Sequence, residues 1–326
     1  MPRVLIAAIS AATLMLFLGP KFLVWLRANE VGQFIRPEGL IPGAHQEKQG
    51  TPTMGGILIL VATALPFVIL SSRSTEAMLV LFVTVACGLI GFLDDFMKVV
   101  KRRSLGLAGK WRILGLLAVT AVFVPVAVTI VGLPTTLTVP IADRSFDLGS
   151  IAYFILVFLV VTAAANAVNL TDGLDGLAAG VAGIVLTCYT AIAFVGGQRD
   201  LAIFGATLVG ACIGFLWFNS FPAAVFMGDT GSYALGGAVA AMAVMTKTEI
   251  LLIVIGMVFV AEALSVIIQV VVFKKLRRRV FLMTPVHHHF EMADWTETKI
   301  IVRFWLVAAL FAAVGFTLFF RDLQTI

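Results

Sequence analysis

Long, nearly uninterrupted apolar segments are the feature that most constrains this chain. A helix crosses the hydrocarbon core of a bilayer with about 20 apolar residues, whereas the strands of membrane barrels are shorter and alternate in polarity. Backbone groups must be satisfied inside the bilayer, so runs of this length predict helices. The sequence therefore predicts an all-α polytopic membrane protein, a single domain over residues 1–326 with ten transmembrane helices. The expected spans are residues 4–26, 54–71, 76–93, 113–132, 151–168, 177–195, 200–218, 233–246, 250–272 and 300–320.

Composition agrees with a membrane location, because 60% of the residues are hydrophobic and only 13% are charged, more apolar surface than a soluble domain buries. The first run lacks a small-residue cleavage site and is too long for a signal peptide, so we expect it to be retained. The run at 233–246 is short, and if it did not cross the membrane, the predicted orientation of all later spans would be reversed. Residues 132–150 could form a small hairpin. The three cysteines lie in apolar runs without metal-ligand spacing, which predicts neither disulfides nor a zinc site.

Lysine and arginine residues set the expected orientation, because they gather in cytoplasmic loops. The loops that follow odd-numbered spans hold fifteen of them and the opposite side holds six. Both termini are therefore expected outside. The excess of lysine and arginine stays on the same side from the first loop to the last, which also supports an even number of spans. The net charge of +5 then reflects topology rather than binding to nucleic acid.

Acidic and amide side chains fall at the predicted cytoplasmic ends of separate spans. Asp94 and Asp95 end the third span, where adjacent like charges at the electronegative end of a helix are unfavourable. They are either solvated acids balanced by Lys98 and Lys101, or a pair that awaits a cation. We favour the cation.

Two further segments combine glycine with carboxylates. Residues 169–176, Asn-Leu-Thr-Asp-Gly-Leu-Asp-Gly, could be a capping box that opens the sixth span. Capping needs one or two groups, yet polar residues recur every third position at Asn166, Asn169, Asp172 and Asp175, which favours function. Asp229, in residues 226–232, either caps the eighth span or binds Mg²⁺ beside phosphate oxygens.

Residues 51–56 look first like a helix start with Pro52 at its first position, although Lys48 and Thr53 face the same compartment as the aspartates and are plausible ligand contacts. Three consecutive histidines at 287–289 cannot all face one ion from a regular helix, so a diphosphate is a better partner for them than zinc. Glu262 and Gln269 lie on one face of the ninth span, and this predicts either a role or a structural hydrogen bond.

Taken together, these segments resemble the phospho-N-acetylmuramoyl-pentapeptide transferase family. The resemblance runs in order along nearly the whole chain and rests on five motifs. They are Thr-Pro-Thr-Met-Gly-Gly at 51–56, Asp-Asp at 94–95, Asn-Ala-Val-Asn-Leu-Thr-Asp-Gly-Leu-Asp-Gly at 166–176, Phe-Met-Gly-Asp-Thr-Gly-Ser at 226–232 and Thr-Pro-Val-His-His-His-Phe-Glu at 284–291.

The resemblance implies a homodimer in the bacterial inner (cytoplasmic) membrane. It also implies transfer of phospho-MurNAc-pentapeptide from UDP-MurNAc-pentapeptide to undecaprenyl phosphate, which gives lipid I and UMP with Mg²⁺ as cofactor. An undecaprenyl phosphate oxygen is already largely anionic, so charge neutralisation matters more than a strong base. We favour direct attack by the lipid phosphate over a covalent aspartyl intermediate.

By the same resemblance Asp229 is the metal ligand, and Asp94, Asp95 and His288 join it as catalytic residues. Lys48, Asp175 and Phe226 would form the uridine pocket. The other expected substrate contacts are Thr53, Lys98, Lys110, Asn166, Asn169, Asp172, Asn219, Gln269, His287 and His289.

Two rival functions remain open on the sequence alone. A transporter would place acids deep in the spans or on both faces, whereas only Glu262 is well inside. A sibling transferase would use another UDP-N-acetylhexosamine, such as UDP-GlcNAc, with the same chemistry.

Overall fold

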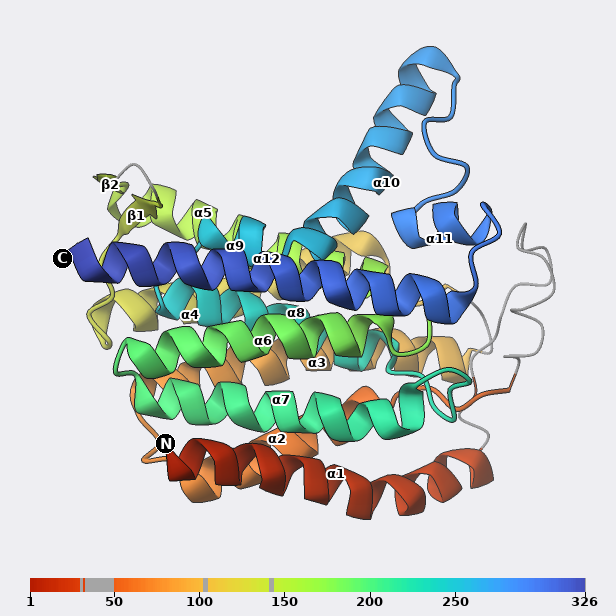
Figure 1. Cartoon of the computed structure of the whole chain (residues 1–326), viewed down its shortest axis with the longest axis horizontal. Coiled ribbons are helices and arrows are strands. Elements are labelled where there is room, and N and C mark those ends of the chain that lie inside the picture. The colour runs from red at the N-terminus through yellow and green to blue at the C-terminus, as the bar shows by residue number, and fades with distance from the viewer. Residues whose placement is uncertain (30–31, 33–49, 102–104, 141–143, 326) are drawn as a thin grey trace.

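The computed structural model describes residues 1–29, 32, 50–101, 105–140 and 144–325, and shows a bundle of long helices that run roughly side by side (Figure 1). In chain order the elements are α1 (Pro2–Ala28), α2 (Gly56–Leu70), α3 (Thr75–Val100), α4 (Gly109–Thr129), β1 (Thr136–Val139), β2 (Arg144–Asp147), α5 (Gly149–Thr171), α6 (Leu177–Val195), α7 (Arg199–Asn219), α8 (Gly228–Met245), α9 (Leu251–Ile255), α10 (Met257–Leu276), α11 (Val286–Glu291) and α12 (Glu297–Thr325).

Within the described residues, eight helices are long and apolar enough to cross a membrane: α1, α3, α4, α5, α6, α7, α10 and α12. The prediction of a polytopic helical membrane protein is therefore confirmed. The second and eighth predicted spans correspond to α2, a shorter apolar helix of 15 residues, and to α8, which has 18 residues. Ten crossings therefore stay a prediction.

Helix α8 lies at the centre of the bundle, where it packs against α2, α3, α5 and α6. Nearly all of its residues are buried. Glycines permit this close packing: a Cβ at Gly91 of α3 would overlap the backbone of Asp229, and one at Gly236 would overlap α5 near Ala165. A helix enclosed by protein on every side can be rich in glycine and alanine, and this explains its weak hydropathy signal.

The ninth predicted span is two helices rather than one. Helix α9 ends at Ile255, Gly256 stands between, and α10 begins at Met257. Helix α10 then leaves the bundle at a steep angle, and α11 returns beside the beginning of α12 (Figure 1). Glycine lowers the cost of such a change in direction.

A small antiparallel hairpin joins α4 to α5, as residues 132–150 predicted, and qualifies the all-α fold class. Strands β1 and β2 pair Thr136 with Asp147 and Val139 with Arg144. The hairpin lies at the same end of the bundle as both chain termini (Figure 1). The start of α8 and the helix α11 lie at the opposite end.

Candidate active site

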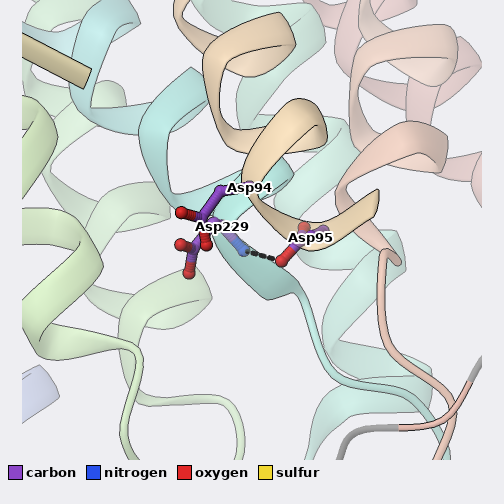
Figure 2. Close-up of side chains that lie close together, drawn as sticks. All are labelled: Asp94, Asp95 and Asp229. Atoms are coloured by element: carbon purple, nitrogen blue, oxygen red, sulfur yellow. Dashed lines mark hydrogen bonds between the residues drawn. The ribbon is translucent and has the colours of Figure 1, made fainter. Parts of the chain in front are cut away.

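Three carboxylates from two helices meet where the end of α3 lies beside the start of α8 (Figure 2). One oxygen each of Asp94, Asp95 and Asp229 can be chosen so that all lie within 4.8 Å of one another. Asp94 and Asp95 are buried, and the carboxylate of Asp229 is largely so. Separate segments thus bring these three carboxylates together, while their role as one functional site stays a prediction.

Lys98 supplies the positive charge of the cluster. It lies one turn after Asp94 on α3, and its Nζ is 2.6 Å from Asp94 Oδ2 and 3.0 Å from Asp229 Oδ2. The same atom is 3.9 Å from Asp95 Oδ1. One ammonium group therefore faces three carboxylates, so the cluster keeps a surplus of negative charge.

Asp95 is a cap for helix α8. Its Oδ1 accepts the backbone N–H of Asp229 at 3.1 Å, and its Oδ2 accepts both the N–H and the hydroxyl of Thr230, at 2.9 and 2.7 Å. A carboxylate at a helix N-terminus is favoured by unpaired N–H groups and by the helix dipole. Asp95 therefore anchors α8 to α3, a role that the Asp-Asp pair alone did not indicate.

Asp94 is enclosed by the segment that follows α3. Its Oδ1 accepts the N–H of Leu107 at 2.7 Å. A Cβ at Gly106 would overlap the carboxylate, so the chain can pass this closely only with glycine there. Sequence reasoning missed Gly106 and Leu107, because a backbone donor leaves no side-chain signal.

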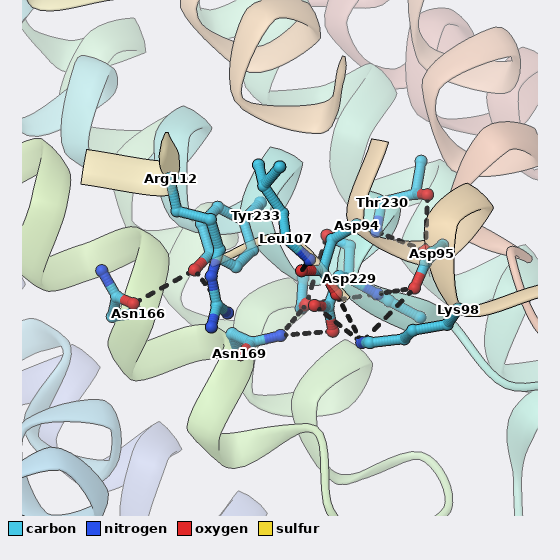
Figure 3. Close-up of polar contacts among 12 residues, drawn as sticks. Asp94, Asp95, Lys98, Leu107, Arg112, Asn166, Asn169, Asp229, Thr230 and Tyr233 are labelled. Atoms are coloured by element: carbon cyan, nitrogen blue, oxygen red, sulfur yellow. Dashed lines mark hydrogen bonds and ion pairs between the residues drawn. The ribbon is translucent and has the colours of Figure 1, made fainter. Parts of the chain in front are cut away.

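Helix α5 contributes two asparagines from the third-position repeat. Asn169 Nδ2 donates to Asp229 Oδ1 and to Ser232 Oγ, both at 2.9 Å. Asn166 Oδ1 accepts the hydroxyl of Tyr233 at 3.1 Å (Figure 3). Both amides therefore face α8, and Asn169 orients the Asp229 carboxylate directly.

Arg112, near the start of α4, adds a second cation beside the cluster. Its Nη1 donates to the hydroxyl of Tyr233 at 3.4 Å (Figure 3). Tyr233 therefore joins α4 to α5 through Asn166. Neither Arg112 nor Tyr233 was predicted as a site residue.

Asp172 follows α5 and faces the same cluster. Burial of its carboxyl and the negative charges of Asp229, Asp95 and Asp175 raise its pKa well above the ordinary value. The Asp172 carboxyl therefore adds to the crowding of acids at this end of the bundle.

Asp175 and Asn219 connect the two loops beside the cluster. Asp175 Oδ2 accepts the N–H of Ala223 at 2.9 Å, and Asn219 Oδ1 accepts the N–H of Gly176 at 3.1 Å. Asn219 Nδ2 also donates to the carbonyl of Val225 at 2.9 Å. Both side chains are buried and stabilise the loops, while their contact with a nucleotide stays a prediction.

Thr53 and Phe226 lie on two segments that are hydrogen-bonded to each other. The N–H of Phe226 donates to Pro52 at 2.8 Å, and the N–H of Gly55 donates to Phe226 at 2.9 Å. Thr53 is buried next to Gly228, since a Cβ at that glycine would lie 3.1 Å from the Thr53 hydroxyl and 2.7 Å from Asp95. The Phe226 side chain is half-buried.

Two of the predicted basic contacts are not placed at the aspartates. Lys110 is exposed, with its Nζ 5.6 Å from the centre of the Trp111 ring. Lys48 lies outside the described residues. Lys98 is thus the predicted lysine that the described structure brings to the cluster.

The three histidines of α11 have three different partners, as consecutive positions require. His287 is buried against Glu262, His288 pairs with Glu291 through its Nδ1, and His289 Nδ1 accepts the N–H of Leu282 at 3.1 Å. Gln269 stabilises the segment between α10 and α11, because its Oε1 accepts the N–H groups of residues 280 and 281 at 3.0 Å.

The donor set at the aspartates suits a hard divalent cation, because Mg²⁺ prefers carboxylate oxygens. Within the described residues, these three aspartates form the one group of acidic, histidine or cysteine side chains close enough to share an ion. Asp95 already uses both oxygens to cap α8. Asp94 Oδ2 and Asp229 Oδ2 instead face the Lys98 ammonium, a side chain that can move, so these two oxygens are the ones that could turn to a divalent cation.

Comparison with known proteins gives concordant matches. The profile described as Glycosyl transferase family 4 matches residues 77–247, and a phospho-N-acetylmuramoyl-pentapeptide-transferase signature matches residues 48–60. The phospho-N-acetylmuramoyl-pentapeptide-transferase of Geobacillus sp. (strain WCH70) is 48% identical over 95% of this chain and 96% of its own. Those of Geobacillus kaustophilus and Bacillus subtilis (strain 168) are 51% and 47% identical over 91% of this chain and 92% of theirs. The chain therefore belongs to the phospho-N-acetylmuramoyl-pentapeptide-transferase family.

Proposed function

We propose that this protein transfers phospho-MurNAc-pentapeptide from UDP-MurNAc-pentapeptide to undecaprenyl phosphate, giving lipid I and UMP in peptidoglycan synthesis. The observation that carries the proposal is the cluster of Asp94, Asp95 and Asp229 at one end of a helical membrane bundle, in a chain 48% identical to a relative of that name. An oxygen of the lipid phosphate bonds to the β-phosphorus of the nucleotide sugar as the bond from that phosphorus to UMP breaks.

The residues of the cluster divide the work of this reaction. Asp94 and Asp229 would hold Mg²⁺, which supplies neutralisation of the negative charge on the diphosphate. Asn169 keeps Asp229 oriented through its 2.9 Å hydrogen bond. The Lys98 ammonium attracts phosphate oxygens toward the carboxylates that would otherwise repel them. The lipid phosphate is largely ionised near neutral pH, so its attack requires alignment rather than a strong base.

The substrate contacts follow from what surrounds the cluster. Asp172 lies beside the aspartates and the half-buried ring of Phe226 lies on the neighbouring loop, which favours nucleotide binding between these two loops. Asp175 and Lys48 are proposed to complete the uridine pocket. His288 is proposed to contact phosphate or the sugar-peptide portion from α11.

The membrane arrangement completes the proposal. Helices α2 and α8 would add two crossings to those of the eight long apolar helices, among which α10 is counted. Ten crossings would place both termini outside and the cluster at the cytoplasmic face of the inner membrane. Exposed tryptophans at the cluster end of the bundle, Trp25, Trp111 and Trp217, suit a membrane–water interface there. A homodimer is part of the proposal by the family resemblance.

One assay separates this function from its rivals. Purified protein would be incubated with Mg²⁺, undecaprenyl phosphate and either UDP-MurNAc-pentapeptide or UDP-GlcNAc, and UMP release would be measured. We expect UMP from the first donor. Release from UDP-GlcNAc alone would support the sibling transferase, and no UMP from either donor would exclude the transferase function.

A further inference from the structure

Helix α10 touches the bundle only near its beginning. Its buried residues are Val258, Phe259, Glu262 and Ser265, and the later part of the helix stands clear of the bundle (Figure 1). The chain returns to the bundle at α11, which carries the three histidines. Glu262 is therefore an acidic residue in the part of α10 that still packs against the bundle.

Glu262 is buried against the returning helix. Its Oε1 lies 3.1 Å from His287 Nδ1, and both side chains have an exposed fraction of 0%. Within the described residues neither carboxylate oxygen of Glu262 and neither ring nitrogen of His287 has a partner at full hydrogen-bond geometry, so the two side chains meet as a close polar contact. A carboxylate inside a membrane protein is costly unless a polar group compensates it, and the His287 imidazole is the polar group that lies against it.

The opposite edge of His287 lies against the turn between α5 and α6. A Cβ at Gly173 would overlap His287 Nε2, which places the imidazole in direct contact with that backbone. Gly173 follows Asp172, whose carboxyl faces Asp229. Contacts therefore run without a gap from Glu262 through His287 to residues 172–176, beside the carboxylate cluster.

We infer that Glu262 is a positioning residue for the transfer reaction, one that holds His287, and with it α11, against the turn at residues 172–176. The inference rests on the proposed function and adds a residue outside the carboxylate cluster. Without the carboxylate, His287 loses its only polar anchor on α10, and α11 is free to move away from Gly173. The His288 ring, whose centre is 4.1 Å from that of His287, would move with it.

The test is a steady-state comparison of three variants on α10 in the full-length protein. Glu262→Leu fills the space without a polar contact, Glu262→Gln keeps an oxygen that faces His287, and Ser265→Ala is a matched buried control. We expect Glu262→Leu to raise KM for UDP-MurNAc-pentapeptide by about tenfold while KM for undecaprenyl phosphate changes less than about twofold. Glu262→Gln should recover most of the loss, and Ser265→Ala should match the wild type.

A second variant approaches the same contact from the turn. Gly173→Ala should push His287 outward and reproduce the KM effect of Glu262→Leu. Hydrogen–deuterium exchange provides a readout independent of the substrate: both variants should increase exchange at residues 172–176 and 286–291, whereas Ser265→Ala should not. Unchanged exchange there, or equal losses for both substrates, would overturn the inference. A wild-type protein that releases no UMP would instead refute the proposed function. The hydrogen–deuterium exchange result would then decide the inference about Glu262.

Discussion

Helix α8 has buried charge at both ends, and the two ends are built differently. At its start, three carboxylates face the single ammonium of Lys98. Just beyond its other end, Glu249 faces Lys247 at 3.0 Å and also accepts the hydroxyl of Tyr153 at 2.9 Å. Lys247 further donates to the carbonyl of Pro134 at 3.1 Å, which ties the turn to the segment before the hairpin.

We interpret the contrast in charge balance as the difference between the proposed metal-binding cluster and a structural ion pair. A buried pair with equal and opposite charges is neutral overall, and its loss mainly affects folding. Three carboxylates with the Lys98 ammonium among them and the Arg112 guanidinium beside them still carry a surplus of negative charge, and can gain a divalent cation. The same helix thus shows, within one protein, why burial of charge alone does not identify an active site.

The largest expected effect comes from Asp229→Asn, which keeps the shape and the oxygen that accepts Asn169 but removes the charge. We expect the rate of UMP release to fall by about a thousandfold or more, equivalent to ~4 kcal/mol of transition-state stabilisation. The matched control is Asp147→Asn on the exposed hairpin at the far end, which should leave the rate unchanged. Substantial activity in Asp229→Asn would remove Asp229 as the metal ligand.

Breaking the ion pair between Lys247 and Glu249 should lower stability and leave turnover unchanged. Lys247→Met leaves Glu249 buried without its cation, and we expect the free energy of unfolding to fall by about 3 kcal/mol. Thermal denaturation in detergent measures this, with Lys275→Met on the exposed part of α10 as the control. The folded fraction should keep the wild-type turnover, and a selective loss of turnover would show that both ends of α8 serve catalysis.

A smaller effect should separate Asp95 from its neighbour. Asp95→Ala removes the cap of α8, which should cost about 1–2 kcal/mol of unfolding free energy. Asp94→Ala should cost less stability but more turnover, because Asp94 faces the metal site and not the end of the helix. Denaturation curves and UMP release would be measured for both variants. Equal losses of stability and turnover in the two would refute the separate roles of Asp94 and Asp95.

The smallest expected effect is stabilisation by the cation itself. Mg²⁺ at about five times its dissociation constant should raise the free energy of unfolding by ~1 kcal/mol. The shift in melting temperature should persist in Lys247→Met, vanish in Asp229→Asn and disappear with EDTA. An equal shift in all three proteins would indicate nonspecific binding.

The sequence predicted the membrane class, because apolar run length is a local property that tertiary packing leaves unchanged. It also predicted that Asp94, Asp95 and Asp229 gather at one end of the bundle, because each of them lies at the end of an apolar run. The sequence did not predict that Asp94 and Asp95 have different roles. That difference arises from the way α8 begins beside one face of α3, which spacing along a single helix does not encode.

Other features lay beyond sequence reasoning for similar reasons. The apolar run at 250–272 continues through Gly256, so the break between α9 and α10 leaves no change in hydropathy. Leu107 acts through its backbone, and Glu262 and His287 were noticed in separate motifs without any sign that they touch. The missing information was in each case a long-range contact.

Binding of Mn²⁺ as a spectroscopic substitute for Mg²⁺ tests the central claim most directly. Titration of the purified protein, followed by electron paramagnetic resonance, should show Mn²⁺ binding that Asp229→Asn loses and Lys247→Met retains. Equal Mn²⁺ binding by the wild type and Asp229→Asn would contradict the claim that the unbalanced carboxylates at the start of α8 form the metal site.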